Sequence, residues 1–258
     1  MKGIYYDSHI HLVDQRYSDM LPPLLTSMKA LGIKACSMTV DVLTSRKALI
    51  LFGQPYRDTI MNFLGIHPEF ADILNCWEFE VIVRDNPESI DGIGEVGLDY
   101  TYCSSREKYS QQVNVFIRML NLASQLKKPV SIHSRASLDD VLDILTTYNN
   151  LNTCLHWFEG TEKQLKRSLD MGLYVSYGPP VVYSSKKKKL LRLTDLNKIL
   201  VETDGPVKYP ACFESVTSLP SSMLPSIIYA VSRELGLSYE ELRKQIVSNS
   251  CTFLNKSD

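Results

Sequence analysis

Short apolar runs alternate with longer segments of helical periodicity along the whole chain. Runs of this length, bounded by turn residues, are typical of buried β-strands. Eight of them recur at regular intervals, which predicts eight strands separated by helices. The expected strands are Ile4 to His9, Ile33 to Val40, Asn62 to His67, Ile90 to Val96, Pro129 to His133, Thr153 to Trp157, Gly172 to Tyr177 and Lys198 to Thr203.

The segments between these runs carry one apolar stripe each, as amphipathic helices do. Between the first two strands the stripe is Leu21, Leu24, Leu25, Met28 and Leu31, and before the fifth strand it is Val113, Phe116, Ile117, Leu120 and Ala123. We expect Gly32 to end the first helix. Reciprocal caps are expected where Ser or Thr stands three residues before Glu or Gln, at Ser104 with Glu107, Thr161 with Gln164 and Ser238 with Glu241.

Strand-helix alternation of this length requires parallel strands, either in an open doubly wound sheet or in a closed (β/α)8 TIM barrel. Polar residues decide between the two, because they follow the C-terminal ends of many different strands. A barrel gathers its reactive groups in that way, whereas an open sheet takes them from the strands at its switch point. We therefore predict an α/β fold, a closed (β/α)8 TIM barrel, with residues 1–258 in one domain.

One connection departs from the short loops of such a fold. The segment from Gly205 to roughly Ser222 is rich in Pro and Ser and follows the last expected strand. A structureless loop of that length usually has a function, so we expect a rim or lid over the site.

Composition excludes several classes of protein. Hydrophobic residues make up 44% of the chain, and Lys+Arg 28 against Asp+Glu 29 leave a formal net charge of -1, so any nucleic-acid binding must be local. A carboxylate, Asp7, precedes any possible signal-peptide core, no apolar run approaches a membrane span, and the six cysteines lack C-x-x-C spacing. We expect a soluble cytoplasmic protein with reduced cysteines and no obligate protein partner.

Histidines mark the predicted strand ends. His9 and His11 lie two residues apart in Asp7-Ser8-His9-Ile10-His11, so on a strand both side chains point the same way and can hold one cation. Such a pair is only half of a metal site, because a divalent ion takes four or more ligands. The other three histidines of the chain, His67, His133 and His156, also follow strands.

Two carboxylates complete the pattern. Glu95 follows the apolar part of the fourth strand between glycines, and Asp204 ends the eighth strand, with Glu202 on the same strand face. A carboxylate between two cations offers two oxygens and offsets part of their repulsion. Glu95 is therefore positioned to bridge.

These motifs resemble the TatD family of metal-dependent nucleases, a branch of the amidohydrolase superfamily. The resemblance spans nearly the whole chain and rests on Asp7-Ser8-His9-Ile10-His11, Gly65-Ile66-His67-Pro68, Gly94 to Asp99, Pro129 to Arg135, His156-Trp157-Phe158 and Leu200 to Pro206. It implies one ion held by His9, His11, Glu95 and Asp204, and a second held by Glu95, His133 and His156. It departs at Ala136, where the family usually carries an acidic residue, and in the loop after Asp204.

The resemblance implies a DNase with two divalent ions (Mg, Mn or Zn), acting as a 3'-5' exonuclease, an abasic-site endonuclease or both. We expect Glu95 and Asp204 to be catalytic, with Asp204 as general base. Single-stranded DNA or 3' ends are the expected partner. His67 and Arg135 are the expected contacts to substrate phosphate, and Lys186, Lys187, Lys188 and Lys189 the expected grip on a nucleic-acid backbone. For Arg135 a rim salt bridge, and for the lysines a solvated helix face, are equally good interpretations.

Two other functions stay open at this point. One is a hydrolase of small phosphoesters, lactones or amides on the same barrel, although such relatives typically bridge their metals with a carboxylated lysine where this chain has Glu95. The other is a non-catalytic metal-binding scaffold. A scaffold is expected to lose at least one ligand, and none is lost here.

Overall fold

The computed structural model describes residues 5–53, 56–213 and 216–256, and within them eight parallel strands form one sheet in sequence order. Ile4, the expected first residue of the first strand, lies outside these ranges. The strands are β1 Tyr5–Ile10, β2 Ile33–Met38, β3 Ile60–Leu64, β4 Gly92–Asp99, β5 Val130–Arg135, β6 Thr153–Leu155, β7 Tyr174–Tyr177 and β8 Ile199–Val201. Each expected strand is confirmed, with its ends shifted by a few residues.

The sheet curls into a nearly closed barrel. Successive strands pair in parallel register, for example Tyr5 opposite Ile33 and Val175 opposite Ile199. Just beyond β8 the backbone N–H of Asp204 donates to the carbonyl of His9 at 2.9 Å, and the N–H of His11 donates to the carbonyl of Gly205 at 2.7 Å. These bonds join the last strand to the first, as the predicted TIM barrel requires.

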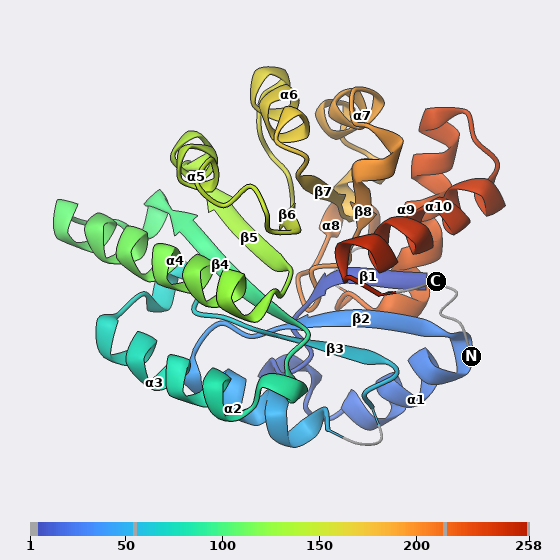
Figure 1. Ribbon diagram of the computed structural model, residues 1–258. Coiled ribbons are helices and arrows are strands. Elements are labelled where there is room, and N and C mark those ends of the chain that lie inside the picture. Colours follow the sequence, from blue (N-terminus) through green and yellow to red (C-terminus); the bar gives the residue numbers. More distant parts are fainter. Residues whose placement is uncertain (1–4, 54–55, 214–215, 257–258) are drawn as a thin grey trace.

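Helices surround the barrel in the order of the chain (Figure 1). The α-helices are α1 Leu21–Leu31, α2 Val42–Leu51, α3 Ile73–Asp85, α4 Arg106–Leu126, α5 Leu138–Leu145, α6 Glu162–Asp170, α7 Ser185–Arg192, α8 Pro210–Phe213, α9 Pro220–Leu235 and α10 Tyr239–Phe253. Short 3-10 helices follow strands or precede them, at η1 Gln15–Tyr17, η2 Pro68–Phe70, η3 Pro87–Ser89, η4 Tyr100–Tyr102, η5 Pro179–Val182 and η6 Leu196–Lys198.

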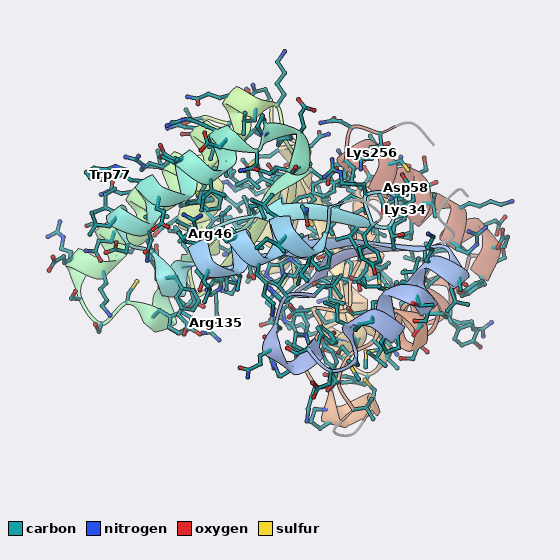
Figure 2. The ribbon with its side chains drawn as sticks, turned by 90° about the horizontal axis from the view of Figure 1, so that it is seen from below. Lys34, Arg46, Asp58, Trp77, Arg135 and Lys256 are labelled. Atoms are coloured by element: carbon teal, nitrogen blue, oxygen red, sulfur yellow. The ribbon has the colours of Figure 1, made fainter. Side chains whose placement is uncertain are left out.

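The apolar core has two parts. The larger part lies between the strands and the surrounding helices. The smaller part fills the barrel with inward-facing strand residues such as Tyr6, Met38 and Phe63. Residues from the end of α10, including Phe253, pack against the same cluster. In Figure 2 the side chains fill the space between the layers, and Trp77 and Arg46 lie on the outer surface.

Glycines let β4 lie tightly against its neighbours. A Cβ atom at Gly92 would come within 2.1 Å of the Phe63 ring inside the barrel. Gly97 has a φ of +148° and lies so close to β5 that a Cβ atom would be 2.0 Å from the carbonyl oxygen of His133. Other residues would be strained there, so the glycines around Glu95 serve strand packing beside the site.

The predicted helix ends are confirmed with one exception. Gly32 ends α1 in the left-handed conformation, and Thr161 and Ser238 form reciprocal caps with Gln164 and Glu241. The expected cap at Ser104 with Glu107 is wrong. The side chain of Ser105 caps α4 instead, accepting from the N–H of Lys108, because the chain turns into the helix one residue later than the sequence motif indicates.

The segment after β8 is more ordered than expected. It contains the short helix α8 and an antiparallel bridge between Lys208 and Thr217, and α9 begins at Pro220; residues 214 and 215 lie outside the described part of the chain. The hydroxyl of Tyr17 donates to the carbonyl of Ser218 and ties the segment to the β1 side. The prediction of a structureless loop is therefore wrong.

The six cysteines all lie in the described ranges and no disulfide links them. Four of them are buried, which agrees with their expected role as small core residues. Among the described residues, no helix combines the length and the apolar character that crossing a bilayer requires.

Candidate metal centre

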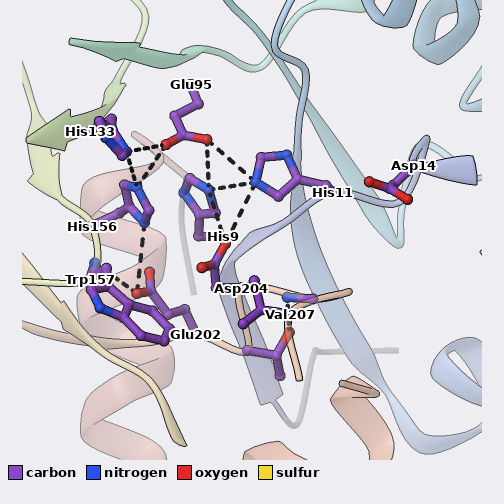
Figure 3. Close-up of polar contacts among 12 residues, drawn as sticks. His9, His11, Asp14, Glu95, His133, His156, Trp157, Glu202, Asp204 and Val207 are labelled. Carbon is purple, nitrogen blue, oxygen red and sulfur yellow. Dashed lines mark hydrogen bonds and ion pairs between the residues drawn. The ribbon is translucent and has the colours of Figure 1, made fainter. Parts of the chain in front are cut away.

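One cleft at the C-terminal ends of the strands collects the residues that the sequence singled out. Its volume is about 620 Å³, and its lining includes His11, Glu95, His133, His156 and Asp204. His9 lies fully buried beneath it on β1. Because the barrel is closed between β8 and β1, residues from opposite ends of the chain meet there (Figure 3).

The first group of ligand atoms surrounds His9 and His11. The Nε2 atoms of the two rings are 3.2 Å apart. Oε2 of Glu95 lies 3.5 Å from His9 Nε2 and 3.4 Å from His11 Nε2, and Oδ1 of Asp204 lies 3.8 and 3.6 Å from the same atoms. Four possible ligand atoms thus surround one point, and they come from β1 and the residue after it, from β4, and from the segment after β8.

The second group surrounds the other oxygen of Glu95. Oε1 is 2.8 Å from Nδ1 of His133 and 2.8 Å from Nε2 of His156, and these two nitrogens are 3.4 Å apart. His67 stands slightly farther away, with its Nε2 3.7 Å from the same oxygen. The carboxylate of Glu95 therefore faces one histidine pair with each oxygen.

The chemistry of this donor set fits divalent metal ions. Ligand atoms around one tetrahedral ion with bonds of about 2.1 Å lie about 3.4 Å from each other. The separations in the first group, from 3.2 to 3.8 Å, bracket that value. Neutral imidazoles and carboxylates are the ligands that Zn²⁺ and Mn²⁺ accept.

Burial and charge keep the carboxylates ionised. Burial alone would raise the pKa of Glu95, but the surrounding histidines, His156 first, lower it well below its usual range. Burial opposes ionisation of Asp204 too, and a hydrogen bond from His11 nevertheless lowers the pKa of Asp204. Both side chains are therefore negatively charged at neutral pH, as metal ligands must be.

A residue without an assigned role in the sequence analysis, Asp99, holds two functional side chains. This fully buried carboxylate at the end of β4 accepts from Nε2 of His133 at 2.8 Å and from Nε of Arg135 at 2.8 Å. Its other oxygen accepts from the N–H and hydroxyl of Thr101. A carboxylate behind a ligand histidine fixes the ring orientation and tautomer. The sequence signal for Asp99 was a second carboxylate four residues after Glu95, at the end of the same strand.

Glu202 occupies the equivalent place behind His156. It is fully buried and accepts from the N–H of Trp157 at 2.7 Å and from the Ser176 hydroxyl at 2.5 Å. Nδ1 of His156 is buried without a hydrogen-bond partner among the described residues and lies 3.9 Å from Oε1 of Glu202. A small ring movement would close this gap and let Glu202 orient the ring.

Asp7 joins the two strands that carry the first ligand group. Its oxygens accept from the N–H of Thr203 at 2.9 Å and from the Thr203 hydroxyl at 2.6 Å. Burial raises the pKa of Asp7 to about 7. The role of the first residue in the opening motif is thus to join β1 to the end of β8, which places His9 and His11 opposite Asp204.

His67 differs from the other histidines in its hydrogen bonds. Its Nδ1 accepts the backbone N–H of Glu69 at 3.2 Å, and burial lowers the pKa of His67 to about 4. A neutral imidazole with an accepting Nδ1 carries its proton on Nε2. His67 therefore presents an N–H donor toward the cleft, which suits a substrate oxygen better than a metal ion.

Arg135 lies at the rim of the same cleft and makes the salt bridge with Asp99 that was one interpretation of its sequence position. It also donates to the hydroxyl of Thr101, and its guanidinium stands 5.3 Å from the centre of the Tyr102 ring. About half of its side chain remains exposed. Arg135 is thus held in place at a position where it can still meet an anion.

The four consecutive lysines, Lys186 to Lys189, lie in different environments. Lys187 is buried: its Nζ donates to the carbonyl of Phe158, lies 3.4 Å from Oε1 of Glu159 and faces the Trp157 ring. The expectation that Lys187 grips a nucleic acid is therefore corrected, because its ammonium group holds the loop after His156 instead. Lys186 and Lys189 are exposed, Lys189 beside Glu162, and Lys188 is half-buried.

The chain is similar over most of its length to several known proteins. A model of the TatD-related DNase family matches residues 6–255. The mouse putative deoxyribonuclease TATDN3 is 26% identical over 95% of this chain and 86% of its own length, and human deoxyribonuclease TATDN3 is 25% identical over 97% and 94%. An uncharacterized metal-dependent hydrolase of Haemophilus influenzae is 26% identical over 96% and 98%.

Solved structures share the fold at lower sequence identity. The Escherichia coli TatD homologue YjjV superimposes with a TM-score of 0.88, at 20% identity and with full coverage of both chains. A TatD-family hydrolase of Entamoeba histolytica gives a TM-score of 0.85 at 19% identity, covering 98% of each chain.

Proposed function

Because the chain belongs to the family of TatD-related DNases and is a metal-dependent hydrolase of ester bonds, we propose that it cleaves the phosphodiester bonds of DNA with two divalent ions. The proposal treats residues 1–258 as one catalytic domain. It assigns His9, His11, Glu95 and Asp204 to one ion, and Glu95, His133 and His156 to the other.

The arrangement of Glu95 is the single observation that carries this proposal. One of its oxygens lies among His9, His11 and Asp204, and the other hydrogen-bonds to His133 and His156. Side chains that can each ligate a metal thus stand on both sides of one carboxylate. This is the arrangement that a bridging ligand requires, and a single-ion site has no need of the second histidine pair.

Divalent ions at this place would polarise a phosphoryl oxygen and make water a stronger acid. The ionised carboxylate of Asp204 takes the proton of the attacking water, because it lies at the inner wall of the cleft with its charge maintained. His67 donates a hydrogen bond from its Nε2–H to a non-bridging phosphoryl oxygen and keeps its proton. Asp99 acts on the chemistry through His133 and Arg135, which donate to it, and Glu202 acts through the ring of His156, which it faces.

Aromatic side chains at the rim favour a nucleic-acid end over a small phosphodiester. Phe70 lines the cleft, and Tyr102 packs against His67 and Arg135 nearby. Both rings are partly exposed, so they offer apolar faces on which unpaired bases can stack. We infer that the substrate is single-stranded DNA or a frayed 3' end, which a 3'-5' exonuclease or an abasic-site endonuclease would attack.

Adding metals back to metal-stripped protein tests this function. We expect Mg, Mn or Zn to restore cleavage of end-labelled single-stranded DNA, with shorter products appearing from the 3' end, and to restore slower cleavage of a small phosphodiester. Double-stranded DNA without frayed ends is expected to react more slowly than single strands. Failure of every metal to restore cleavage of any phosphodiester would contradict the proposal.

The α7 lysines other than the buried Lys187 are expected to contribute to binding of a nucleic-acid polymer. Replacing Lys186, Lys188 and Lys189 together with Ala should weaken binding of single-stranded DNA of any sequence. The slope of log affinity against log salt should flatten by about 0.7 for each phosphate that the variant no longer neutralises. Binding of labelled oligonucleotides across a salt series, measured with Asp204→Asn in both proteins so that the DNA stays intact, gives both effects. Lys187 stays unchanged because its ammonium group holds the loop beside Trp157.

The matched control replaces three lysines at the opposite end of the barrel. Lys29 lies in the last turn of α1, Lys128 precedes β5, and Lys256 pairs with Asp91 just before β4. This variant has the same net charge as the α7 variant and should keep the parent's salt slope. If the α7 variant has an unaltered slope of log affinity against log salt, these lysines form a solvated helix face and do not bind the nucleic acid.

A further inference from the structure

The outer surfaces of α2 and α3 expose several large apolar side chains, although both helices already bury their inner faces. Ala48 on α2 and Phe79 on α3 pack into the core. On the outside, five large apolar side chains are between 55% and 83% exposed, namely Leu43, Ile50, Leu74, Trp77 and Val81. We call these five residues the α2–α3 face.

The spacing of these residues shows that they form stripes. Leu43 and Ile50 are seven positions apart on α2, and Leu74, Trp77 and Val81 are spaced by three and four positions on α3. Residues at such intervals lie on one side of a helix. A helix on the outside of a barrel needs only one apolar side for folding, so the second stripe has no explanation in the folding of a single chain.

The two stripes are neighbours on the molecular surface. Arg46 on α2 and Glu78 on α3 form an ion pair of 2.8 Å that crosses from one helix to the other. Figure 2 shows Arg46 and Trp77 on the same side of the molecule. Leu193 and Tyr229 lie near a similar ion pair, Arg192 of α7 with Glu234 of α9. The α2–α3 face differs from that region in carrying five large apolar side chains that are more than half exposed. A contiguous patch of this kind marks an interaction surface.

The charges on the face indicate which partner fits. The ion pair at the face joins one cation to one anion, each about half exposed, and Arg84 at the end of the α3 stripe pairs with Glu80. Nucleic acid or an anionic membrane would need an excess of cations. A second copy of the same chain needs none, because a twofold axis would bring each Arg46 toward Glu78 of the partner subunit and each Glu78 toward the partner's Arg46.

The area is also sufficient for a second copy. An aromatic side chain such as Trp77 buries on the order of 150–250 Å² and an aliphatic one less. Covering five side chains that are each more than half exposed, together with the ion pair, removes roughly 700 Å² from each chain. A standard interface takes about 800 Å² from each partner. The face therefore supplies most of an interface without any further contact.

We propose that the α2–α3 face is the contact by which two copies of this chain form a twofold-symmetric dimer. The same surface serves on both subunits, so the contact closes after two copies and does not propagate into filaments. Trp77 lies at the centre of the α3 stripe and anchors the contact, as buried aromatic residues commonly do. The proposal is independent of the proposed function.

Sedimentation velocity of the metal-loaded full chain tests the proposal. The parent is expected to form a dimer with a dissociation constant in the micromolar range or below. Ile50→Ser with Trp77→Ser should raise that constant at least about tenfold, with unchanged circular dichroism because both side chains are exposed. The control, Leu193→Ser with Tyr229→Ser, makes a similar change at exposed sites outside the face and should remain dimeric.

A charge exchange tests the twofold geometry. Arg46→Glu alone and Glu78→Arg alone each place like charges against each other across the axis, so each variant should be monomeric. Mixing the two variants should restore a heterodimer, because the two charges are then opposite at both contacts. A monomeric parent at all concentrations would overturn the proposal, as would a dimer that survives the Ile50 and Trp77 changes. A monomeric parent that sediments with lipid vesicles would assign the face to a membrane surface instead.

Discussion

Replacing Glu95 with Ala is expected to lower the metal content more than any other single substitution in this protein. Each oxygen of this carboxylate faces its own pair of histidines, so its loss weakens both ions at once, whereas loss of His11 or His133 weakens one. Elemental analysis of purified variants after equilibration with excess metal and desalting gives the metal content per chain. We expect the Glu95 variant to retain less than half of the parent's metal and to lose DNA cleavage.

His67→Ala is the matched control for this measurement. His67 lies 3.7 Å from the same carboxylate and is similarly buried, but its Nδ1 accepts the N–H of Glu69 and its Nε2 carries the proton. The variant should therefore keep its metal and lose turnover. Full metal content in the Glu95 variant would refute the bridging role, and metal loss in the His67 variant equal to that of His133→Ala would make His67 a ligand.

The second large effect is expected at Asp204. Asp204→Asn keeps the shape of the side chain and one oxygen for the ion, but the amide cannot accept a proton from water. We expect the fold and part of the metal to remain, while the rate of DNA hydrolysis falls at least about 100-fold, as is typical for the loss of a general base. Single-turnover rates at saturating metal, with circular dichroism as the folding check, measure the two effects separately.

Asp14→Asn provides the control for the same chemical change in the same cleft. Asp14 lines the pocket, but its carboxylate pairs with Arg16 at the surface and takes no part in either ligand group. The hydrolysis rate of Asp14→Asn should stay within a few-fold of the parent's rate. If the hydrolysis rate of Asp204→Asn also stays within a few-fold of the parent's rate, a group other than Asp204 accepts the proton.

The placement of Asp204 shows how the barrel makes such a site. The residue has a φ of +47°, in the left-handed region, and its N–H is bonded to the carbonyl of His9 on the first strand. Aspartate tolerates this conformation better than most residues. The bond that closes the barrel thus also directs the carboxylate toward His9 and His11, so closure of the sheet and assembly of the first ligand group depend on the same contacts.

The sequence by itself determined the barrel and the positions of its reactive residues. The order of strands, the end of α1 at Gly32 and the caps at Thr161 and Ser238 depend on local patterns, because hydrophobic periodicity and capping act within one or two helical turns. The placement of His9 on the first strand, Glu95 on the fourth and Asp204 after the eighth follows from the same patterns, since the C-terminal ends of parallel strands lie on one face of a barrel.

Only the tertiary structure decided which of these side chains touch one another and which are hidden. Burial of Lys187 against the loop after His156, the hydrogen bonds of Asp99 to His133 and Arg135, and the link from Asp7 to Thr203 join residues that are distant in sequence. The exposed stripe of α3 equally follows from which of its two apolar sides meets the barrel. Local patterns contain no information on such pairings, because the pairings arise when the sheet closes and each helix settles against it.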